Sequence, residues 1–263
     1  MKKIPIMYTS KQVDEITNAL DEKYNTTSEF IAHEITSEYV HTDIYIGNVA
    51  EDERVYATFG MGARKTASPL ETYQRIELVM FSSRDFDIKS KESRILDSQL
   101  VALSKYPFEN DSWFGPGHTI NANDNFKETF GYDAFVFAAD GFPYEVSKLG
   151  TIRPLIAIPV YQDEVDWMIR NSSMDFLEQF CKSDCFNTLV DKERPHFLPD
   201  EPECDDSKEE TNIDVLMSLF GLTEEQAIAL EKELDTIEHL RNEGEKFYEA
   251  FMELLGKYID IEE

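Results

Sequence analysis

Apolar and polar residues first follow a helical period along the chain. Residues 10–24 predict a helix in which Ser10 is the candidate N-cap, because it stands directly before the periodic stretch. The residues expected on its apolar face are Val13, Ile16, Thr17 and Leu20. The next segment, 29–40, fits a helix poorly and a strand little better, so its structure stays open.

The period then changes to two, which is typical of strands with one buried face. Residues 41–47 and 54–61 alternate in this way, and the polar stretch between them predicts a hairpin. Further strands are expected over 73–81, 134–139 and 152–160. Pro154 and Pro159 favour an edge or irregular position for the last of these, because proline has no N–H for a sheet ladder.

Helical spacing returns over 92–105 and 162–181, whereas 108–125 is rich in Gly, Pro, Asn and Asp and is expected to be a loop. The inward residues expected over 162–181 are Val165, Ile169, Phe176, Leu177 and Phe180. Strands come in clusters rather than in strict alternation with helices. The pattern therefore predicts an α+β fold, in which a mixed or antiparallel β-sheet has flanking helices.

The C-terminal quarter differs in composition, because prolines and like charges that resist packing precede a helical segment. Thr223 and Gln226 fit a capping box at the start of that segment. Its apolar stripe needs a cover, for which docking on the main domain is the first interpretation and a homodimer or a helical partner the alternative. The expected division is an α+β domain over 1–199, an acidic linker over 200–210 and an acidic helical appendage over 211–263.

Charge is the most unusual property of the chain, since 53 acidic residues against 25 basic ones give a net charge of −28. Residues 200–263 hold 21 of these acids and only 5 of the bases. A negative field disfavours nucleic acid and anionic membranes as partners, and it favours a basic protein and speeds the encounter with it. Solubility alone is the other explanation, because net charge bears on solubility rather than on fold.

Targeting and redox signals are weak. No long apolar run follows the two N-terminal lysines, and no stretch approaches the length of a membrane span, so a cytoplasmic protein is expected. Cys181, Cys185 and Cys204 are odd in number and are expected to be reduced thiols.

Motifs that carry chemistry are incomplete. His41 and Asp43 would face the same side of a strand, but two ligands are too few for a structural zinc site. Cys181 and Cys185 have C-x3-C spacing without a second pair of ligands. The segment 115–118 lacks the phosphate-loop pattern, and no G-x-S-x-G nucleophile elbow occurs. We therefore expect no catalytic residue, no cofactor and no metal.

Six sequence blocks stand in an order that is typical of one known family. They are His41-Thr-Asp-Ile-Tyr-Ile; Arg54-Val-Tyr-Ala-Thr-Phe-Gly-Met-Gly; Arg75-Ile-Glu-Leu-Val-Met; Leu103-Ser-Lys-Tyr-Pro with Gly117-His118-Thr-Ile; Pro154 to Glu164; and Val190-Asp-Lys-Glu-Arg194. This order resembles the suppressor-of-fused-like domain family, and the resemblance covers about residues 30–199. Gly62 stands where the family has serine.

The resemblance implies a mixed α/β, sandwich-like domain that binds proteins. The animal member of the family restrains a transcription factor by gripping a peptide, and bacterial members resemble immunity proteins found beside polymorphic toxins. For this chain the resemblance implies an immunity protein that binds and neutralises a cognate toxin, with a nuclease as one candidate. The alternative class is an enzyme with an unrecognised site, such as a hydrolase.

Peptide-binding members form their groove with a tyrosine near the helix end and an acidic residue before the loop histidine. Tyr106 matches the first position, and Gly117 stands at the second. The aromatic loop nearby is a plausible contact surface, and a loop folded back on the core is the other interpretation. The expected partner-binding residues are Tyr106, Phe108, Trp113, Phe114, His118, Asp205, Asp206, Glu209 and Glu210.

Overall fold

The computed structural model describes residues 6–26, 28–34, 39–49, 53–190, 194–199 and 223–234, together with residues 236, 254 and 257. The chain divides into two compact units, Met1–Pro199 and Asp200–Glu263. The sheet and the helices that cover it belong to the first unit, and helix α7 belongs to the second.

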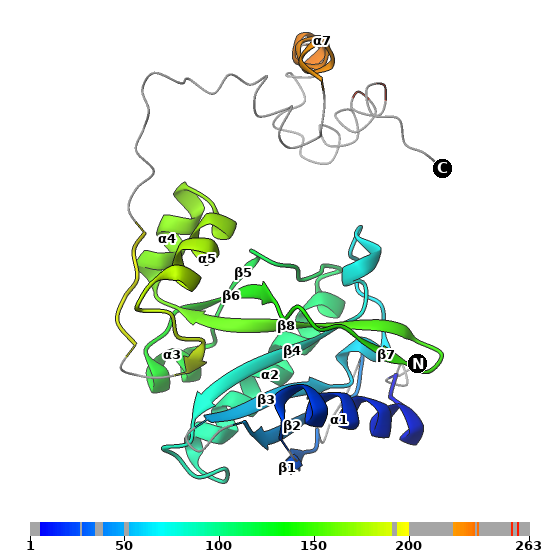
Figure 1. Ribbon diagram of the computed structural model, residues 1–263, viewed down its shortest axis with the longest axis vertical. Coiled ribbons are helices and arrows are strands. Elements are labelled where there is room, and N and C mark those ends of the chain that lie inside the picture. Colours follow the sequence, from blue (N-terminus) through cyan, green and yellow to red (C-terminus); the bar gives the residue numbers. More distant parts are fainter. Residues whose placement is uncertain are drawn as a thin grey trace. The chain divides into compact units, whose positions relative to one another are not determined.

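A mixed β-sheet forms the middle of the first unit (Figure 1). Its strands are β1 (Ser28–Ala32), β2 (Asp43–Asn48), β3 (Glu53–Phe59), β4 (Ile76–Ser83), β5 (Thr119–Asn121), β6 (Ala134–Ala139), β7 (Tyr144–Val146), β8 (Gly150–Val160) and β9 (Leu189–Val190). Within the described residues, the main path runs β1-β2-β3-β4-β8-β6-β5, while β7 pairs with β8 and β9 with β4. Strand β4 is parallel to β8 and β9, and the other pairs are antiparallel. The predicted α+β fold with a mixed sheet is therefore confirmed.

Helices cover both faces of this sheet. They are α1 (Ser10–Tyr24), α2 (Lys91–Glu109), α3 (Asp124–Phe130), α4 (Gln162–Arg170) and α5 (Ser173–Lys182), with two 3₁₀ helices, η1 (Met61–Ala63) and η2 (Glu71–Tyr73). Helices α2 and α3 share one core with inward residues such as Phe135 of β6. On the opposite face, α1 covers β2 and β3, and α4 and α5 cover β6 and β8. Because successive strand residues face opposite sides, the sheet separates these cores.

Helix α1 and the first hairpin follow the sequence pattern closely. Thr9, rather than the expected Ser10, is the N-cap of α1, because the Thr9 hydroxyl accepts the backbone N–H of Gln12 over 3.4 Å. The Gln12 side chain accepts the backbone N–H of Thr9 in return, over 2.9 Å, which completes a capping box. Strands β2 and β3 pair antiparallel, as the alternation predicts. The segment 29–40, whose structure the sequence pattern left undecided, contributes most of β1, which pairs with β2.

Strand β8 corrects the expectation of an edge or irregular strand, because it lies between β4 and β6. Pro154 pairs with β4 but lies outside the ladder with β6, which ends at Leu155. Pro159 pairs with β6 but lies beyond Ile156, the last residue that pairs with β4. Each proline therefore belongs to one ladder only, so a central strand tolerates the missing N–H groups.

The expected helix over 162–181 is two helices, α4 and α5. The chain leaves helical geometry at Asn171, and the Ser172 hydroxyl caps α5 by accepting the backbone N–H of Asp175 over 3.2 Å. Ile169 was expected inside, yet it is 75% exposed. The other expected inward residues, Val165, Phe176, Leu177 and Phe180, are buried.

The described part of the second unit is mainly helix α7 (Glu224–Leu234). Its predicted capping box is present, since the Gln226 side chain accepts the Thr223 N–H over 2.8 Å and the Thr223 hydroxyl accepts the Gln226 N–H over 3.3 Å. Ala227 and Leu230 are buried on one side of this helix. The proposed linker 200–210 lies outside the described residues.

Candidate functional site

Strand β5 forms one edge of the sheet, and its outer side has no partner strand among the described elements. The strand falls inside 108–125, which was expected to be a loop throughout. The N–H of Ala122 donates inward to Asp133 over 2.9 Å. Because inward and outward peptide groups alternate along a paired strand, the peptide groups of Thr119 and Asn121 face the open edge. This edge offers hydrogen bonds to an added strand.

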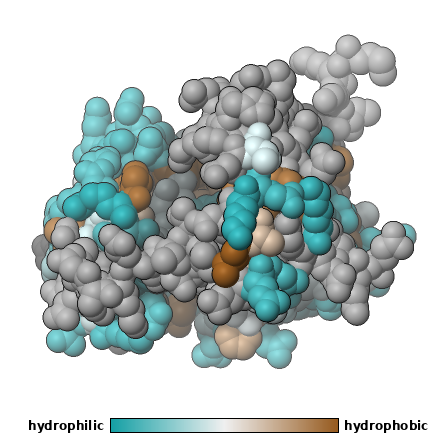
Figure 2. Space-filling view, turned by 90° about the horizontal axis from the view of Figure 1, so that it is seen from above, coloured by the Kyte–Doolittle hydropathy of each residue, from teal (hydrophilic) through white to brown (hydrophobic). Residues whose placement is uncertain are grey.

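A groove of about 520 Å³ follows this edge. Strand β5 forms its floor, and its walls come from α2 and α4, which lie on opposite faces of the sheet. The apolar side chains that line the walls are Ala102, Leu103, Tyr106, Val165 and Ile169. Two of them are open to solvent, Ile169 at 75% and Tyr106 at 39% exposure. Among the coloured residues of the face seen in Figure 2, hydrophilic ones predominate and hydrophobic ones form small separate patches.

The structure separates the expected aromatic contact residues. Tyr106 reaches the groove and stacks on Phe114, whose ring centroid is 5.7 Å away, whereas Phe114 itself is only 3% exposed and belongs to the core. Phe108 is half-buried against the same core. Trp113 is half-buried, and His118 lies at its edge with ring centroids 4.4 Å apart. The four expected acidic contacts, Asp205, Asp206, Glu209 and Glu210, lie outside the described residues.

Gly117 shows why this loop requires glycine. Its φ is +80°, and an added Cβ would lie 3.1 Å from the sulfur of Met174 on α5. Its N–H donates to the carbonyl of Phe137 over 2.8 Å, which joins the loop to β6. The position where peptide-binding relatives have an acidic residue is therefore a tight turn against α5.

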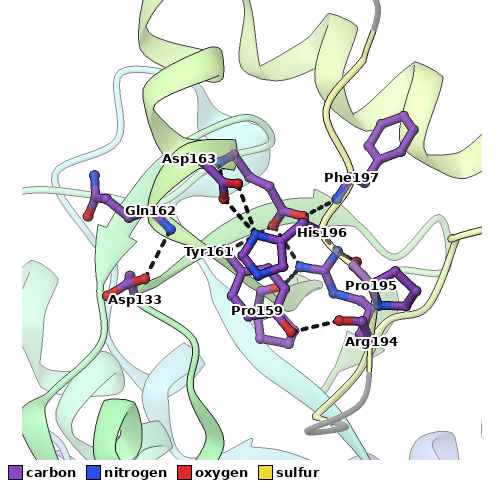
Figure 3. Close-up of polar contacts among 10 residues, drawn as sticks. Asp133, Pro159, Tyr161, Gln162, Asp163, Arg194, Pro195, His196 and Phe197 are labelled. Carbon is purple, nitrogen blue, oxygen red and sulfur yellow. Dashed lines mark hydrogen bonds and ion pairs between the residues drawn. The ribbon is translucent and has the colours of Figure 1, made fainter.

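Glu164, in the first turn of α4, forms a buried ion pair with Arg194 (Figure 3). Both side chains have 0% exposure. Arg194 Nη1 donates to Oε1 over 2.8 Å and Nη2 donates to Oε2 over 2.6 Å, so the contact is bidentate. The carboxylate also accepts the backbone N–H of Tyr161 over 2.9 Å and of Phe197 over 2.8 Å. The three hydrogen bonds from Arg194 and Phe197 tie the segment 194–199 to the start of α4, and the bond from Tyr161 caps the helix.

Aromatic rings enclose the same guanidinium. The rings of Tyr132, Tyr161 and Phe180 have centroids 5.4, 4.9 and 5.2 Å from it. Burial alone would lower the pKa of Arg194, but the hydrogen bonds and charge of Glu164 raise it above its ordinary value.

His196 lies beside Tyr161 and Asp163 in this cluster (Figure 3), and its side chain is 57% exposed. Its ring stacks on Tyr161 at 3.7 Å between centroids and 2° between planes, and its Nδ1 lies 2.9 Å from Asp163 Oδ2. Arg194 and His196 together therefore hold the corner between β8 and α4. Because Val165 and Ile169 follow on α4, this cluster positions one wall of the groove.

Glu77 on β4 is the second buried carboxylate at a position of the family pattern, and it is 1% exposed. Its Oε1 accepts the Tyr8 hydroxyl over 2.5 Å and the N–H groups of Gly60 and Gly62 over 3.0 and 2.9 Å. Its Oε2 accepts the Thr58 hydroxyl over 2.5 Å. The Glu77 carboxylate therefore holds the turn at η1 and does not face solvent.

The turn at η1 restricts which residue can stand at position 60, and its buried contacts act on the pKa of Glu77. Gly60 has φ +142°, and an added Cβ would lie 1.9 Å from the carbonyl oxygen of His41, so only glycine fits there. Burial raises the pKa of Glu77, although its four hydrogen bonds act in the opposite direction.

Metal-binding groups do not gather in the described part of the chain. No group of three or more His, Cys, Asp or Glu side chains there could hold a metal ion. Asp43 instead contacts two histidines, with His33 Nδ1 and His41 Nε2 each 3.0 Å from its oxygens. Cys181 and Cys185 are free, and Cys204 lies outside the described residues. Of the helices that the structure describes, none has the length and apolar character to cross a membrane.

Comparison with known proteins gives one family. The family model of Suppressor of fused protein (SUFU) matches residues 38–195. The structure is similar to a chain of "the Sufu-Fu complex crystal structure", with a TM-score of 0.55, 14% identity, and 76% of this chain and 100% of that chain covered. A crystal structure of Drosophila Suppressor of Fused has a TM-score of 0.48 and 14% identity, with 70% and 50% of the two chains covered. No curated protein sequence matches the chain.

Proposed function

Because the chain belongs to the suppressor of fused family, we propose that it is a protein-binding module that holds an extended segment of a partner at the open edge of β5. Family membership, which the sequence blocks had indicated, implies a module of this kind. The observation that carries the proposal is the groove, in which an unpaired strand edge lies between two apolar helix walls. Peptides that add a strand to a sheet obtain affinity from main-chain hydrogen bonds and specificity from pockets for alternate side chains.

The partner is a basic protein, and we propose that it is a toxin that this chain neutralises as an immunity protein. The net charge of −28 supports a basic partner, because opposite fields raise association rates ~10- to 1,000-fold at low ionic strength. The same field opposes the binding of nucleic acid. Surface ion pairs contribute only ~0–1 kcal/mol each, so the exposed Ile169 and Tyr106 are the candidates for most of the binding free energy.

Two roles are separable in this proposal. The groove holds the partner and so governs dissociation, whereas the acids of the linker 200–210 steer it and so govern association. Neutralising Asp205, Asp206, Glu209 and Glu210 together is expected to slow association and to flatten its dependence on salt, because screening shortens the range of the field. Association that is equally fast at low and physiological ionic strength would show that the acidity serves solubility instead.

The groove is tested with the product of the adjacent gene as the partner, by co-expression and by measurement of its dissociation constant. Thr119→Pro removes a backbone N–H that faces the open edge, and we expect it to weaken binding at least ~5-fold through the lost hydrogen bond. Thr119→Ala is the matched control, because it removes the side chain and keeps the N–H. Equal effects of the two variants would contradict strand addition.

A second pair of variants tests the apolar wall. Ile169→Asp is expected to weaken binding at least ~10-fold, because it places a charge at the centre of the interface. Phe142→Asp is the control, since Phe142 is 69% exposed and does not line the groove. If both variants leave binding unchanged, the partner uses another surface.

A further inference from the structure

A second cavity lies away from the groove and is lined by three cationic side chains. It has a volume of about 410 Å³ and lies between η2, the start of β4 and the turn that leads into β8. Lys65, Arg75 and Arg153 line it, and Glu71 is the one carboxylate among the lining residues that the structure describes. It shares no lining residue with the groove. The site is therefore separate from the proposed partner surface.

The cations of this cavity form no ion pair with any residue that the structure describes, although 53 acids stand against 25 bases in the sequence. Elsewhere in the described part of the chain, several cations pair with a carboxylate, as Lys23 does with Asp140 and Lys105 with Glu34. The cavity therefore gathers three cations that form no ion pair with a described residue, in a chain with a net charge of −28.

The two arginines also keep free donors. The Nε atoms of Arg75 and Arg153 are buried and have no hydrogen-bond partner in the described part of the chain. Arg75 uses Nη1 to bind the carbonyl oxygens of Gly62 and Ala63, over 2.7 and 2.9 Å. Burial lowers the pKa of Arg75, and no carboxylate offsets this effect. Buried donors without acceptors normally call for a ligand or an ordered water.

We propose that this cavity binds a small phosphorylated molecule, with the phosphoryl group held by Arg153, Arg75 and Lys65. The lining charges leave an excess of two positive charges, which matches a phosphoryl dianion better than a single carboxylate. Arginine forks suit the several acceptor oxygens of such a group. The volume lies in the range of small-ligand sites, ~300–1,000 Å³, and the net charge of −28 disfavours a polynucleotide.

Calorimetric titration of the full chain at low ionic strength tests this site, with inorganic phosphate and adenosine 5′-monophosphate as probes. Arg153→Gln is expected to weaken binding at least ~10-fold, because it removes charge-assisted hydrogen bonds. Glu71→Gln is expected to strengthen binding ~2- to 5-fold, because it removes the one lining carboxylate, which is exposed. Opposite effects at two lining positions are a signature that a loss of folding would not produce.

Arg94→Gln on α2 is the matched control, because Arg94 is exposed and does not line the cavity. It is expected to leave the affinity unchanged, as is the groove variant Ile169→Asp, which keeps this test independent of the proposed function. The assignment would be overturned if neither phosphate probe binds at millimolar concentration, or if Arg94→Gln weakens binding as much as Arg153→Gln does. It would also be overturned if succinate, a dianion without a phosphoryl group, binds as tightly as phosphate. Similar affinities for inorganic phosphate and adenosine 5′-monophosphate would show that the cavity recognises only the phosphoryl group. Tighter binding of the nucleotide would show that the cavity also contacts its nucleoside part.

Discussion

Two carboxylates of the first unit are equally buried and are stabilised in different ways. Glu164 faces a cation, because Arg194 holds both of its oxygens and two backbone N–H groups complete the contacts. Among the described residues, Glu77 accepts hydrogen bonds only from hydroxyl and backbone N–H donors, those of Tyr8, Thr58, Gly60 and Gly62. The first arrangement is an ion pair in a low-dielectric interior, and the second is a charge solvated by the protein's own neutral dipoles.

Replacing the carboxylate has different consequences at Glu164 and at Glu77. An ion pair in the interior is costly to break, because removal of one charge leaves the other buried and uncompensated. A carboxylate among neutral donors leaves no such charge behind when it is replaced, but its own ionisation is costly. Accordingly, burial raises the pKa of Glu77. Asp97 on α2 is a third case, since its Oδ1 is buried and has no hydrogen-bond partner among the residues that the structure describes.

The largest expected effect comes from breaking the ion pair. Glu164→Gln keeps the shape of the side chain and removes its charge, so Arg194 is left buried without a counter-charge. We expect the free energy of unfolding to fall by ~3–5 kcal/mol. Urea unfolding monitored by tryptophan fluorescence measures this, because both tryptophans, Trp113 and Trp167, lie in the first unit.

A double variant tests the cause of that loss. Glu164→Gln with Arg194→Met removes both charges, and we expect it to recover ~2 kcal/mol relative to Glu164→Gln alone. No recovery would mean that the four hydrogen bonds at Glu164, rather than the buried charge, account for the effect.

Sequence patterns predicted β2, β3, β4, β6 and β8 and most helices, because period and propensity are local properties. They wrongly predicted an edge or irregular position for β8. A central strand tolerates Pro154 and Pro159 only because its ladders with β4 and β6 end next to them, and the ends of ladders are set by tertiary structure. They also placed Ile169 inside, because its spacing fits one long helix. The serine cap at Ser172 was the available signal for the break.

The candidate site was predictable only in part for a related reason. Tyr106 was found through its place in a family block, and the structure places it in the groove. Phe114 carries the same apolar signal but lies in the core, since a list of aromatic residues does not show which ones face solvent. The open edge of β5 had no sequence signal, because a three-residue strand is too short to show a period.

The third carboxylate, Asp97, sharpens the comparison with an effect of intermediate size. Burial raises its pKa from 3.8 to about 7. The unfolded chain therefore loses this proton at a lower pH than the folded chain does, so stability falls as pH rises from about 4 through about 7. Asp97→Asn is expected to remove this loss and to stabilise the protein by ~1–3 kcal/mol at pH 8, with little gain at pH 4.

The matched control for Asp97 is Asp184→Asn, which removes the same charge from an exposed position. It corrects for the general benefit of a lower negative charge. A gain of equal size with both variants, or a gain that does not change with pH, would contradict the assignment to burial.

The smallest expected effect is at Glu77, where the isosteric change leaves no buried cation. In Glu77→Gln the remaining carbonyl oxygen still accepts the donors of the η1 turn, and the new amide N–H can face the Thr58 oxygen. We expect a cost of ~1 kcal/mol near pH 4, which is several-fold below that of Glu164→Gln. Because the folded-state pKa of Glu77 is raised, the wild-type chain loses stability as pH rises through that value, and the glutamine chain does not. The cost should therefore shrink with increasing pH, measured by the same urea unfolding with exposed Glu128→Gln as the control. If Glu77→Gln lowers the free energy of unfolding as much as Glu164→Gln does, the loss in both regions comes from the hydrogen bonds to the carboxylate. An uncompensated buried charge would then not be its cause.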